Sequence, residues 1–176
     1  IGESRNPADI FRYVASNSSA FAGGTIGPNA QPLADKRVDL IALQSWWEYC
    51  DQQGFQYNSV IDYETSVRNV LQEVAAAGRA SVTLKDGKWS VIVDRPQSII
   101  AQHFTPINTW GYTCSKTFNK LPHAFRCMFI NEENGYLQDE MLVFDDGYNE
   151  SNATLFESIS FPGITKASLA WKHARE

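Results

Sequence analysis

Residues 39–94 read DLIALQSWWEYCDQQGFQYNSVIDYETSVRNVLQEVAAAGRASVTLKDGKWSVIVD, and this stretch decides the fold. Asp39 is placed to cap a helix over residues 40–53, because an aspartate side chain can accept a hydrogen bond from the first free backbone N–H groups. At about 100° per residue, one half of that helix is apolar. This half carries Leu43, Trp46, Trp47, Cys50, Ala42 and Tyr49. Gly54 predicts the end of the helix through a left-handed C-terminal residue.

Two further elements follow in the same stretch. Residues 55–61 alternate apolar and polar side chains, which predicts a half-buried strand. Residues 64–77 then predict a second helix that ends at Gly78. Its apolar positions form one narrow stripe, made of Val67, Val70, Leu71, Val74 and Ala77.

The dipeptide Asp86-Gly87 predicts a hairpin with a two-residue type I′ turn, because it separates two alternating runs and tolerates positive φ at both positions. Pairing Lys85 with Lys88 sets the register and places one apolar face on the hairpin. That face consists of the pairs Leu84 with Trp89, Val82 with Val91 and Ala80 with Val93. Thr83, Ser90 and Ser81 fall on the other face. We expect Trp89 and Leu84 to be buried against the helical stripe, and Arg79 and Asp94 to meet at the open end.

The flanking regions differ in character. Asn6-Pro7 predicts the start of a short N-terminal helix, and the Ser, Asn and Gly content of residues 16–32 predicts a mobile loop. After Pro96 the pattern indicates strands at residues 98–105, 112–118, 125–130, 136–144 and 155–161. Asn134-Gly135 predicts a hairpin turn, and Thr165 predicts the cap of a last helix over residues 166–175.

These elements predict an α+β fold, in which N-terminal helices pack on a small antiparallel sheet. A β-rich module with a terminal helix follows. We place the domain boundary near Pro96, which gives domains at residues 6–95 and 97–176. We also expect the chain to be a piece of a longer polypeptide, because it begins at Ile1 and ends at Glu176 within the last predicted helix.

Composition excludes several classes of protein. A net charge of -5 and a pI near 5.2 argue against a surface that neutralises phosphates or anionic lipids. No apolar run reaches the roughly 20 residues that a membrane span requires. The three cysteines are widely spaced, so we expect buried, reduced thiols rather than a disulfide framework or a zinc site; they are Cys50, Cys114 and Cys127.

The residues whose side chains could take part in catalysis or metal binding form no recognised motif. His103, His123 and His173 are predicted in a strand, a loop and a helix, so no local scaffold brings two imidazoles to one metal. The densest acidic group faces water at strand ends and turns, and comprises Asp139, Glu140, Asp145 and Asp146. Neither a nucleophile elbow nor a nucleotide-binding loop is present. We therefore assign no catalytic, cofactor-binding or metal-binding residue, and no cofactor.

Aromatic residues leave one binding function open. Trp46, Trp47, Tyr49, Phe55 and Tyr57 could form a platform for stacking sugars, although both tryptophans lie on the apolar side of their helix, which favours core packing. Ile41 projects from the polar side and hints at a contact surface. The order of helices and hairpin also resembles a winged helix, but the balance of charges there is poorly suited to phosphate.

Long blocks of the sequence resemble the tail tip attachment proteins of lambda-like phages and prophages, also called host specificity protein J. The blocks are NPADIFRYV, RVDLIALQSWWEYCDQQGFQYNSVIDY, VLQEVAAAGRASVTLKDGKWSVIVDRP, HFTPINTWGY, LPHAFRCMFINEENGYLQDEMLVFDDGY and ATLFESISFPGITKASLAWKHAR. Together they extend from Asn6 to Arg175, and the match is poorest over residues 16–32.

The resemblance implies a structural component of the baseplate hub, located at the virion tail tip and made in the bacterial cytoplasm. It implies a homotrimer in the full-length protein, with other tail tip and tail tube proteins as partners. Residues 6–95 would be a domain that decorates the hub, and residues 97–176 part of a tube or barrel-like module. It carries over no catalytic residue, so we expect no enzyme activity. From the acidic balance we expect no nucleic-acid partner, and we expect no membrane insertion by this chain. The alternatives are a carbohydrate or host-surface binding module and a hydrolase.

Overall fold

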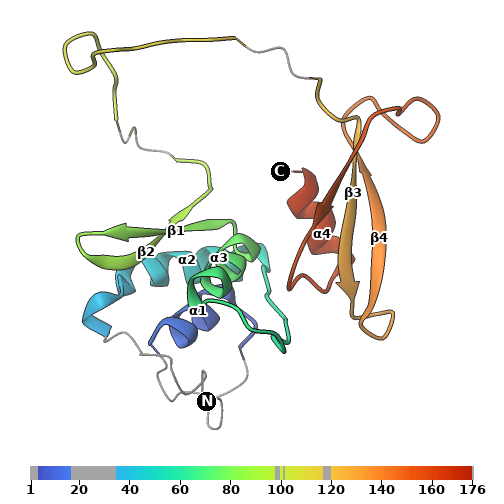
Figure 1. Cartoon of the computed structure of the whole chain (residues 1–176), viewed down its shortest axis with the longest axis horizontal. Coiled ribbons are helices and arrows are strands. Elements are labelled where there is room, and N and C mark those ends of the chain that lie inside the picture. Colours follow the sequence, from blue (N-terminus) through green and yellow to red (C-terminus); the bar gives the residue numbers. More distant parts are fainter. Residues whose placement is uncertain (1–3, 17–34, 98–99, 101, 117–119, 176) are drawn as a thin grey trace.

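The computed structural model describes residues 4–16, 35–97, 100, 102–116 and 120–175. The fold is α+β, with helices and a hairpin in the first half and a three-stranded sheet in the second (Figure 1). In chain order the elements are α1 (Pro7–Ser16), η1 (Asp35–Arg37), α2 (Leu40–Gln53), α3 (Val67–Ala77), β1 (Ala80–Lys85), β2 (Lys88–Val93), β3 (Ala124–Asn131), β4 (Leu137–Phe144), β5 (Phe156–Ser160) and α4 (Ala167–Arg175). Apart from Ser16, the loop predicted over residues 16–32 lies outside the described residues.

The predicted helix caps of the first half are confirmed. The Asn6 side chain accepts a hydrogen bond from the backbone N–H of Ala8 at 3.0 Å, and Asp39 does the same for Ala42 at 3.2 Å. Gly54 ends α2 with a φ of +72°. These side chains satisfy N–H groups that have no partner within their helix, which is why the helices begin where they do.

Helix α3 begins later than the sequence pattern predicts. Ser66 is in an extended conformation and its hydroxyl accepts from the backbone N–H of Asn69 at 3.2 Å, so the helix begins at Val67 instead of residue 64. Gly78 ends α3, but its φ is -104° and it is Arg79 that is left-handed. Gly78 is a glycine for a different reason: a Cβ there would lie 2.6 Å from the Trp46 ring.

The strand predicted over residues 55–61 is wrong. This segment forms no ladder in the structure. Instead the Tyr57 N–H donates to the Arg5 carbonyl at 3.0 Å, and the Asn58 N–H donates to the Gly163 carbonyl at 2.8 Å. The alternation reflects burial instead, since Phe55 and Tyr57 are buried and the residues between and beside them are not.

The hairpin has the predicted register, with all six pairs from Ala80–Val93 to Lys85–Lys88. Asp86 and Gly87 both have positive φ, and Arg79 Nη2 lies 2.7 Å from the Asp94 carboxylate. The expected burial of the tip is wrong: Leu84 is 64% exposed and Trp89 is only partly buried. Helix α3 contacts β1 and helix α2 contacts β2, but the turn residues 85–88 are exposed.

Ser90 is buried although it lies on the face predicted to be polar. Residues Val38 and Asp39 run alongside β2, with the Asp39 N–H donating to the Trp89 carbonyl at 2.8 Å. The Ser90 hydroxyl donates to the Asp39 carboxylate at 3.1 Å. One aspartate therefore caps α2 and also satisfies a buried hydroxyl on the hairpin.

The second half contains a three-stranded sheet of order β4-β3-β5. Strands β3 and β4 are antiparallel, and β5 is parallel to β3, which confirms the strands predicted at residues 125–130, 136–144 and 155–161. The strands predicted at residues 98–105 and 112–118 are absent from the described parts of those ranges; residues 98, 99, 101, 117 and 118 lie outside the described residues.

The described strands form no closed barrel, which corrects the expectation of a barrel-like module. Three strands are too few to close, and the sheet ends at β4 on one side and β5 on the other. Helix α4 packs against β3 and β4 on the side that faces the N-terminal helices (Figure 1).

Both halves contribute to one cluster of buried apolar side chains. Trp46 is fully buried and meets Phe11 edge to face, with 5.8 Å between ring centroids. Phe129 of β3 and Leu169 of α4 belong to the same cluster. The predicted division into domains near Pro96 stays a prediction.

Candidate functional site

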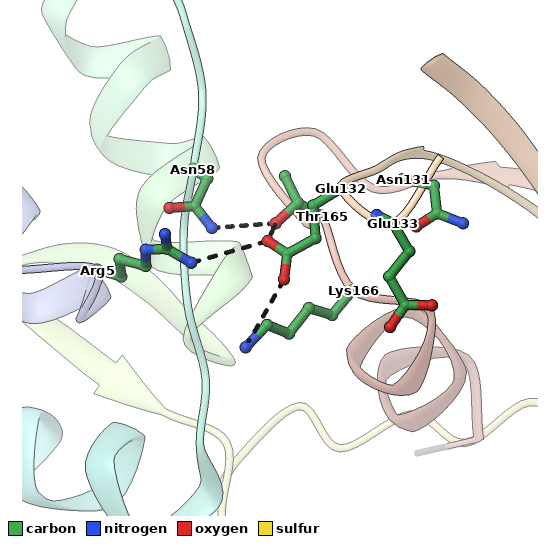
Figure 2. A network of polar contacts seen from close by, with 7 residues as sticks. All are labelled: Arg5, Asn58, Asn131, Glu132, Glu133, Thr165 and Lys166. Carbon is green, nitrogen blue, oxygen red and sulfur yellow. Dashed lines mark hydrogen bonds and ion pairs between the residues drawn. The ribbon is translucent and has the colours of Figure 1, made fainter. Parts of the chain in front are cut away.

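A polar network joins the first half of the chain to the second (Figure 2). At its centre is Glu132, which follows β3. Its carboxylate lies 3.7 Å from Arg5 Nη1 and 3.9 Å from Lys166 Nζ, and accepts a hydrogen bond from the Thr165 hydroxyl at 3.0 Å. Asn58 donates to the same hydroxyl oxygen at 3.0 Å. Glu132 thus links the N-terminal segment, the segment after α2 and the start of α4.

Thr165 has a different role from the predicted one. We expected it to cap the last helix, but its hydroxyl lies between Asn58 and Glu132. The Leu169 and Ala170 N–H groups of α4 donate to the Lys166 carbonyl. Thr165 is buried, so its hydroxyl requires partners within the protein. The neighbouring Glu133 carboxylate points away from the network in Figure 2.

A second contact between the halves surrounds His173. Its ring stacks on Phe55 at 5.0 Å and lies 5.8 Å from Phe161. Burial and, secondarily, the charge of Arg79 lower the pKa of His173 to about 4, so the imidazole is neutral at pH 7. Lys172 donates to the backbone carbonyl and side chain of Gln53 beside it. The two contacts hold the halves together.

The other two histidines lie elsewhere. The His123 Nδ1 accepts from the Thr154 backbone N–H at 3.1 Å, and its ring stacks on Tyr148 at 4.0 Å. His103 lies in an exposed segment that is not a strand, contrary to its predicted place. Among the residues that the structure describes, no three His, Cys, Asp or Glu side chains gather closely enough to hold a metal ion.

The acidic group predicted from the sequence separates into two pairs. Asp139 accepts a hydrogen bond from Asn131 at 2.8 Å, which lowers the pKa of Asp139, and Glu140 lies 3.4 Å from Arg126. Two further carboxylates, of Asp145 and Asp146, pair with Arg175 at 3.9 Å and 2.6 Å. These contacts stabilise the sheet and α4 rather than gather carboxylates at one reacting centre.

The aromatic platform considered from the sequence does not form. Trp46, Phe55 and Tyr57 are buried. The core position expected for Trp47 is wrong, since 38% of it is exposed and its Nε1 donates to the Asp9 carboxylate at 3.0 Å. Trp47 borders a hollow of about 370 Å³ between α1 and α2. Ile41 is exposed, as predicted.

Two of the three cysteines fit the expected environment. Cys50 and Cys127 are buried, and burial raises the pKa of both thiols, that of Cys50 to about 12. Cys114 is exposed, which corrects the expectation that all three are buried. All three are free thiols.

The most unusual surface was not foreseen from the sequence. Residues 102–116, here called the arm, run apart from both halves between β2 and β3 (Figure 1). Asn108 orders a turn within the arm, because its side chain accepts from the Thr105 N–H at 2.7 Å and donates to the His103 carbonyl at 2.8 Å. Ile107 is 97% exposed and Trp110 is 90% exposed. The signal was Pro106, Asn108 and Gly111, which favour turns over a strand.

The second exposed apolar surface is the face of the sheet opposite α4, here called the open face. Alternation along the strands places Cys127 and Phe129 toward the core and leaves Ile130, Leu142 and Phe156 exposed on the other side. Arg126 and Glu140 form an ion pair on the same face.

Comparison with known proteins adds no relative. No protein-family model matches the chain. No curated protein matches it either. Of the helices that the structure describes, none combines the length and apolar character of a bilayer span. The chain is an α+β protein in which the arm and the open face are among the surfaces that expose apolar side chains.

Proposed function

We propose that the chain is a structural component of a phage tail tip, part of the baseplate hub at the distal end of the tail. The resemblance to tail tip attachment proteins supports this proposal, and the exposed apolar side chains of the arm carry it. Ile107 and Trp110 are almost fully exposed on a hydrogen-bonded turn. Such side chains are covered when a protein is one subunit of an assembly.

In this proposal the chain contributes to virion assembly and host attachment as a scaffold, and it is not an enzyme. Its full-length parent forms a homotrimer at the virion tail tip, after synthesis in the bacterial cytoplasm. Its partners are other tail tip proteins and the tail tube, without nucleic acid and without membrane insertion. Residues 6–95 decorate the hub, and residues 97–176 contribute to its tube-like part.

The experiment is immunogold labelling of purified virions with an antibody raised against this chain. We expect gold particles at the distal end of the tail. Virions from a lysogen with a stop codon at Trp46 are the control, and this change should also abolish infectivity. Labelling of the capsid, or virions that are unlabelled and remain infectious in the stop-codon lysogen, would contradict the proposal.

A second candidate is binding of carbohydrate on the host surface, favoured by the exposed rings of Trp110 and Tyr112. Aromatic rings present an apolar face together with a polar edge, which suits sugars. A glycan array probed with the chain tests this candidate. Signal that disappears in the Trp110→Ala variant would favour it over a purely structural role.

A further inference from the structure

We propose that the contact at His173 makes the junction between the two halves sensitive to acid: when its imidazole takes up a proton, the second half separates from the first while each half stays folded. This change goes beyond the proposed function and does not depend on it. His173 lies on α4, and its ring contacts Phe55 of the first half and Phe161 of the second. It is therefore placed where a change of charge acts directly on the junction.

The junction is made mainly by irregular segments rather than by packed helices and strands. The elements of each half pack among themselves. A backbone hydrogen bond between the halves joins Asn58, which follows α2, to Gly163, which follows β5. The chain passes from one half to the other through the arm, which runs apart from both (Figure 1). In the described part of the chain no β-ladder crosses the junction, so the halves can separate without loss of secondary structure.

The surroundings of the His173 ring suit the neutral imidazole. Its Nε2 atom is buried and has no hydrogen-bond partner among the residues that the structure describes. Protonation would place an N–H group there without an acceptor, and a buried donor without an acceptor is costly. The ring stacks on Phe55, and the Lys172 ammonium lies 4.8 Å from the centroid of the same Phe55 ring. A charged imidazole would therefore meet a like charge beside Phe55.

The cations around His173 also oppose protonation of its ring. Burial, and after it the charge of Arg79, lower the pKa of His173 to about 4, and Lys172 acts in the same direction. The backbone of Ala77 at the end of α3 acts in the opposite direction, with a smaller effect. Arg79 precedes β1 and Lys172 belongs to α4, so the ring faces a cation from each half.

Two carboxylates near the ring are engaged elsewhere. Glu73 of α3 accepts a hydrogen bond from the Tyr57 hydroxyl at 3.5 Å, and Asp94 after β2 pairs with Arg79 at 2.7 Å. Glu73 and His173 line a hollow of about 260 Å³ between α3 and the end of β5. Packing of the two halves is therefore incomplete beside the ring, which lowers the cost of separating them.

Each half buries side chains of its own, which allows it to stay folded when the junction opens. In the first half, Phe11 of α1 and Trp46 of α2 are fully buried against each other. In the second half, Ala124, Cys127 and Val143 are buried outside the cluster that the halves share. Helix α4 packs against β3 and β4 of the same half. Opening of the junction is thus a sub-global event, distinct from unfolding of the whole chain.

The Asn58 N–H group reports the opening directly, because it donates to the Gly163 carbonyl of the other half at 2.8 Å. Its hydrogen exchange requires this bond to break, so its protection factor measures the ratio of closed to open chains. The pKa of His173 is about 4 in the closed form and 6.5 when the ring is released. After allowance for partial exposure, the ratio of open to closed chains should rise about 10- to 20-fold between pH 7 and pH 5.

The test is native-state hydrogen exchange of the whole chain, followed by NMR at pH 7 and pH 5 and corrected for the intrinsic exchange rate. We expect the protection factor of Asn58 to fall about 10- to 20-fold, while the amides of α3 and β3 keep theirs. His173→Phe retains an aromatic ring that does not titrate, so this variant should keep the protection of Asn58 at pH 5. The matched control His123→Phe changes a ring that stacks on Tyr148 away from the junction and should show the wild-type loss.

A second control addresses the other titratable group of the junction. The Glu132 carboxylate contacts Arg5 and Lys166, so its protonation could also weaken the contact between the halves. Glu132→Gln removes this titration and should still show the 10- to 20-fold loss at Asn58. The ring protons of His173 in the wild type give a measurement that needs no variant, and we expect them to titrate below pH 5.

Four results would overturn the proposal. The protection of Asn58 could be the same at both pH values, or the amides of α3 and β3 could lose protection together with it, which would mean that the whole chain unfolds. The loss could persist in His173→Phe or disappear in either control variant, which would mean that another group carries the effect. A titration midpoint of the His173 ring at or above pH 6 would show that the closed junction does not disfavour the proton.

Discussion

Gly163 is a position where a single methyl group would disturb the packing between the two halves. Its φ is +75°, and a Cβ there would overlap the ring of Tyr57, which is buried. The backbone on both sides is fixed as well, since the Asn58 N–H donates to the Gly163 carbonyl. The variant Gly163→Ala therefore introduces both backbone strain and a steric clash.

The two costs can be separated with a second glycine. Gly147 has a φ of +87°, but a Cβ there would meet no atom within 4 Å. Gly147→Ala should cost about 1 to 2 kcal/mol, the usual penalty of a left-handed residue with a Cβ. Gly163→Ala should cost about 1 to 3 kcal/mol more, because a buried ring must shift in a packed interior.

The assay is urea unfolding followed by tryptophan fluorescence and by far-ultraviolet circular dichroism. We expect both signals to report one transition, because one buried cluster spans the two halves. Equal losses in the two variants, within about 0.5 kcal/mol, would refute the packing of Tyr57 against Gly163.

Three further predictions concern the hairpin, pH and nucleic acid. Trp89→Ala should cost about 2 kcal/mol and Leu84→Ala less than about 0.5 kcal/mol in the same urea assay, because Trp89 is partly buried and Leu84 is 64% exposed. The pKa of His173 is about 4 in the folded state and 6.5 in the unfolded state, so between these pH values only the unfolded state binds the proton. The free energy of unfolding is therefore highest above about pH 6.5 and falls as the pH falls toward 4. After allowance for partial exposure, the wild type should lose about 2 kcal/mol more than His173→Phe between pH 7 and pH 4 in urea titrations. In fluorescence anisotropy at low salt, the Kd for duplex DNA should be no lower than roughly 10 μM. A submicromolar Kd would support the winged-helix alternative.

The features predicted correctly from the sequence depend on neighbours along the chain. The register of the hairpin follows from Asp86-Gly87, and the caps of α1 and α2 follow from Asn6 and Asp39, because each is decided within four residues. Strands β3, β4 and β5 were also predicted, since turn residues separate them.

The features that were missed depend on residues far away in the sequence. Residues 55–61 have the alternation of a strand, but only the distant Arg5 and Gly163 show which hydrogen bonds they make. The burial of Ser90 depends on Val38 and Asp39 beside β2. The exposure of the arm was missed for the same reason, because alternation does not show whether a partner strand exists.

The network around Glu132 has a consequence for the order in which the protein folds during synthesis. Asn58 and Thr165 are separated by 107 residues, so at 5 to 20 residues per second the ribosome needs on the order of 5 to 20 s to supply the partner. During that interval Phe55 and Tyr57 lack their covering residues from the second half. The nascent chain therefore exposes aromatic surface until translation passes α4. A chaperone that binds exposed aromatic side chains can bind the chain during that interval.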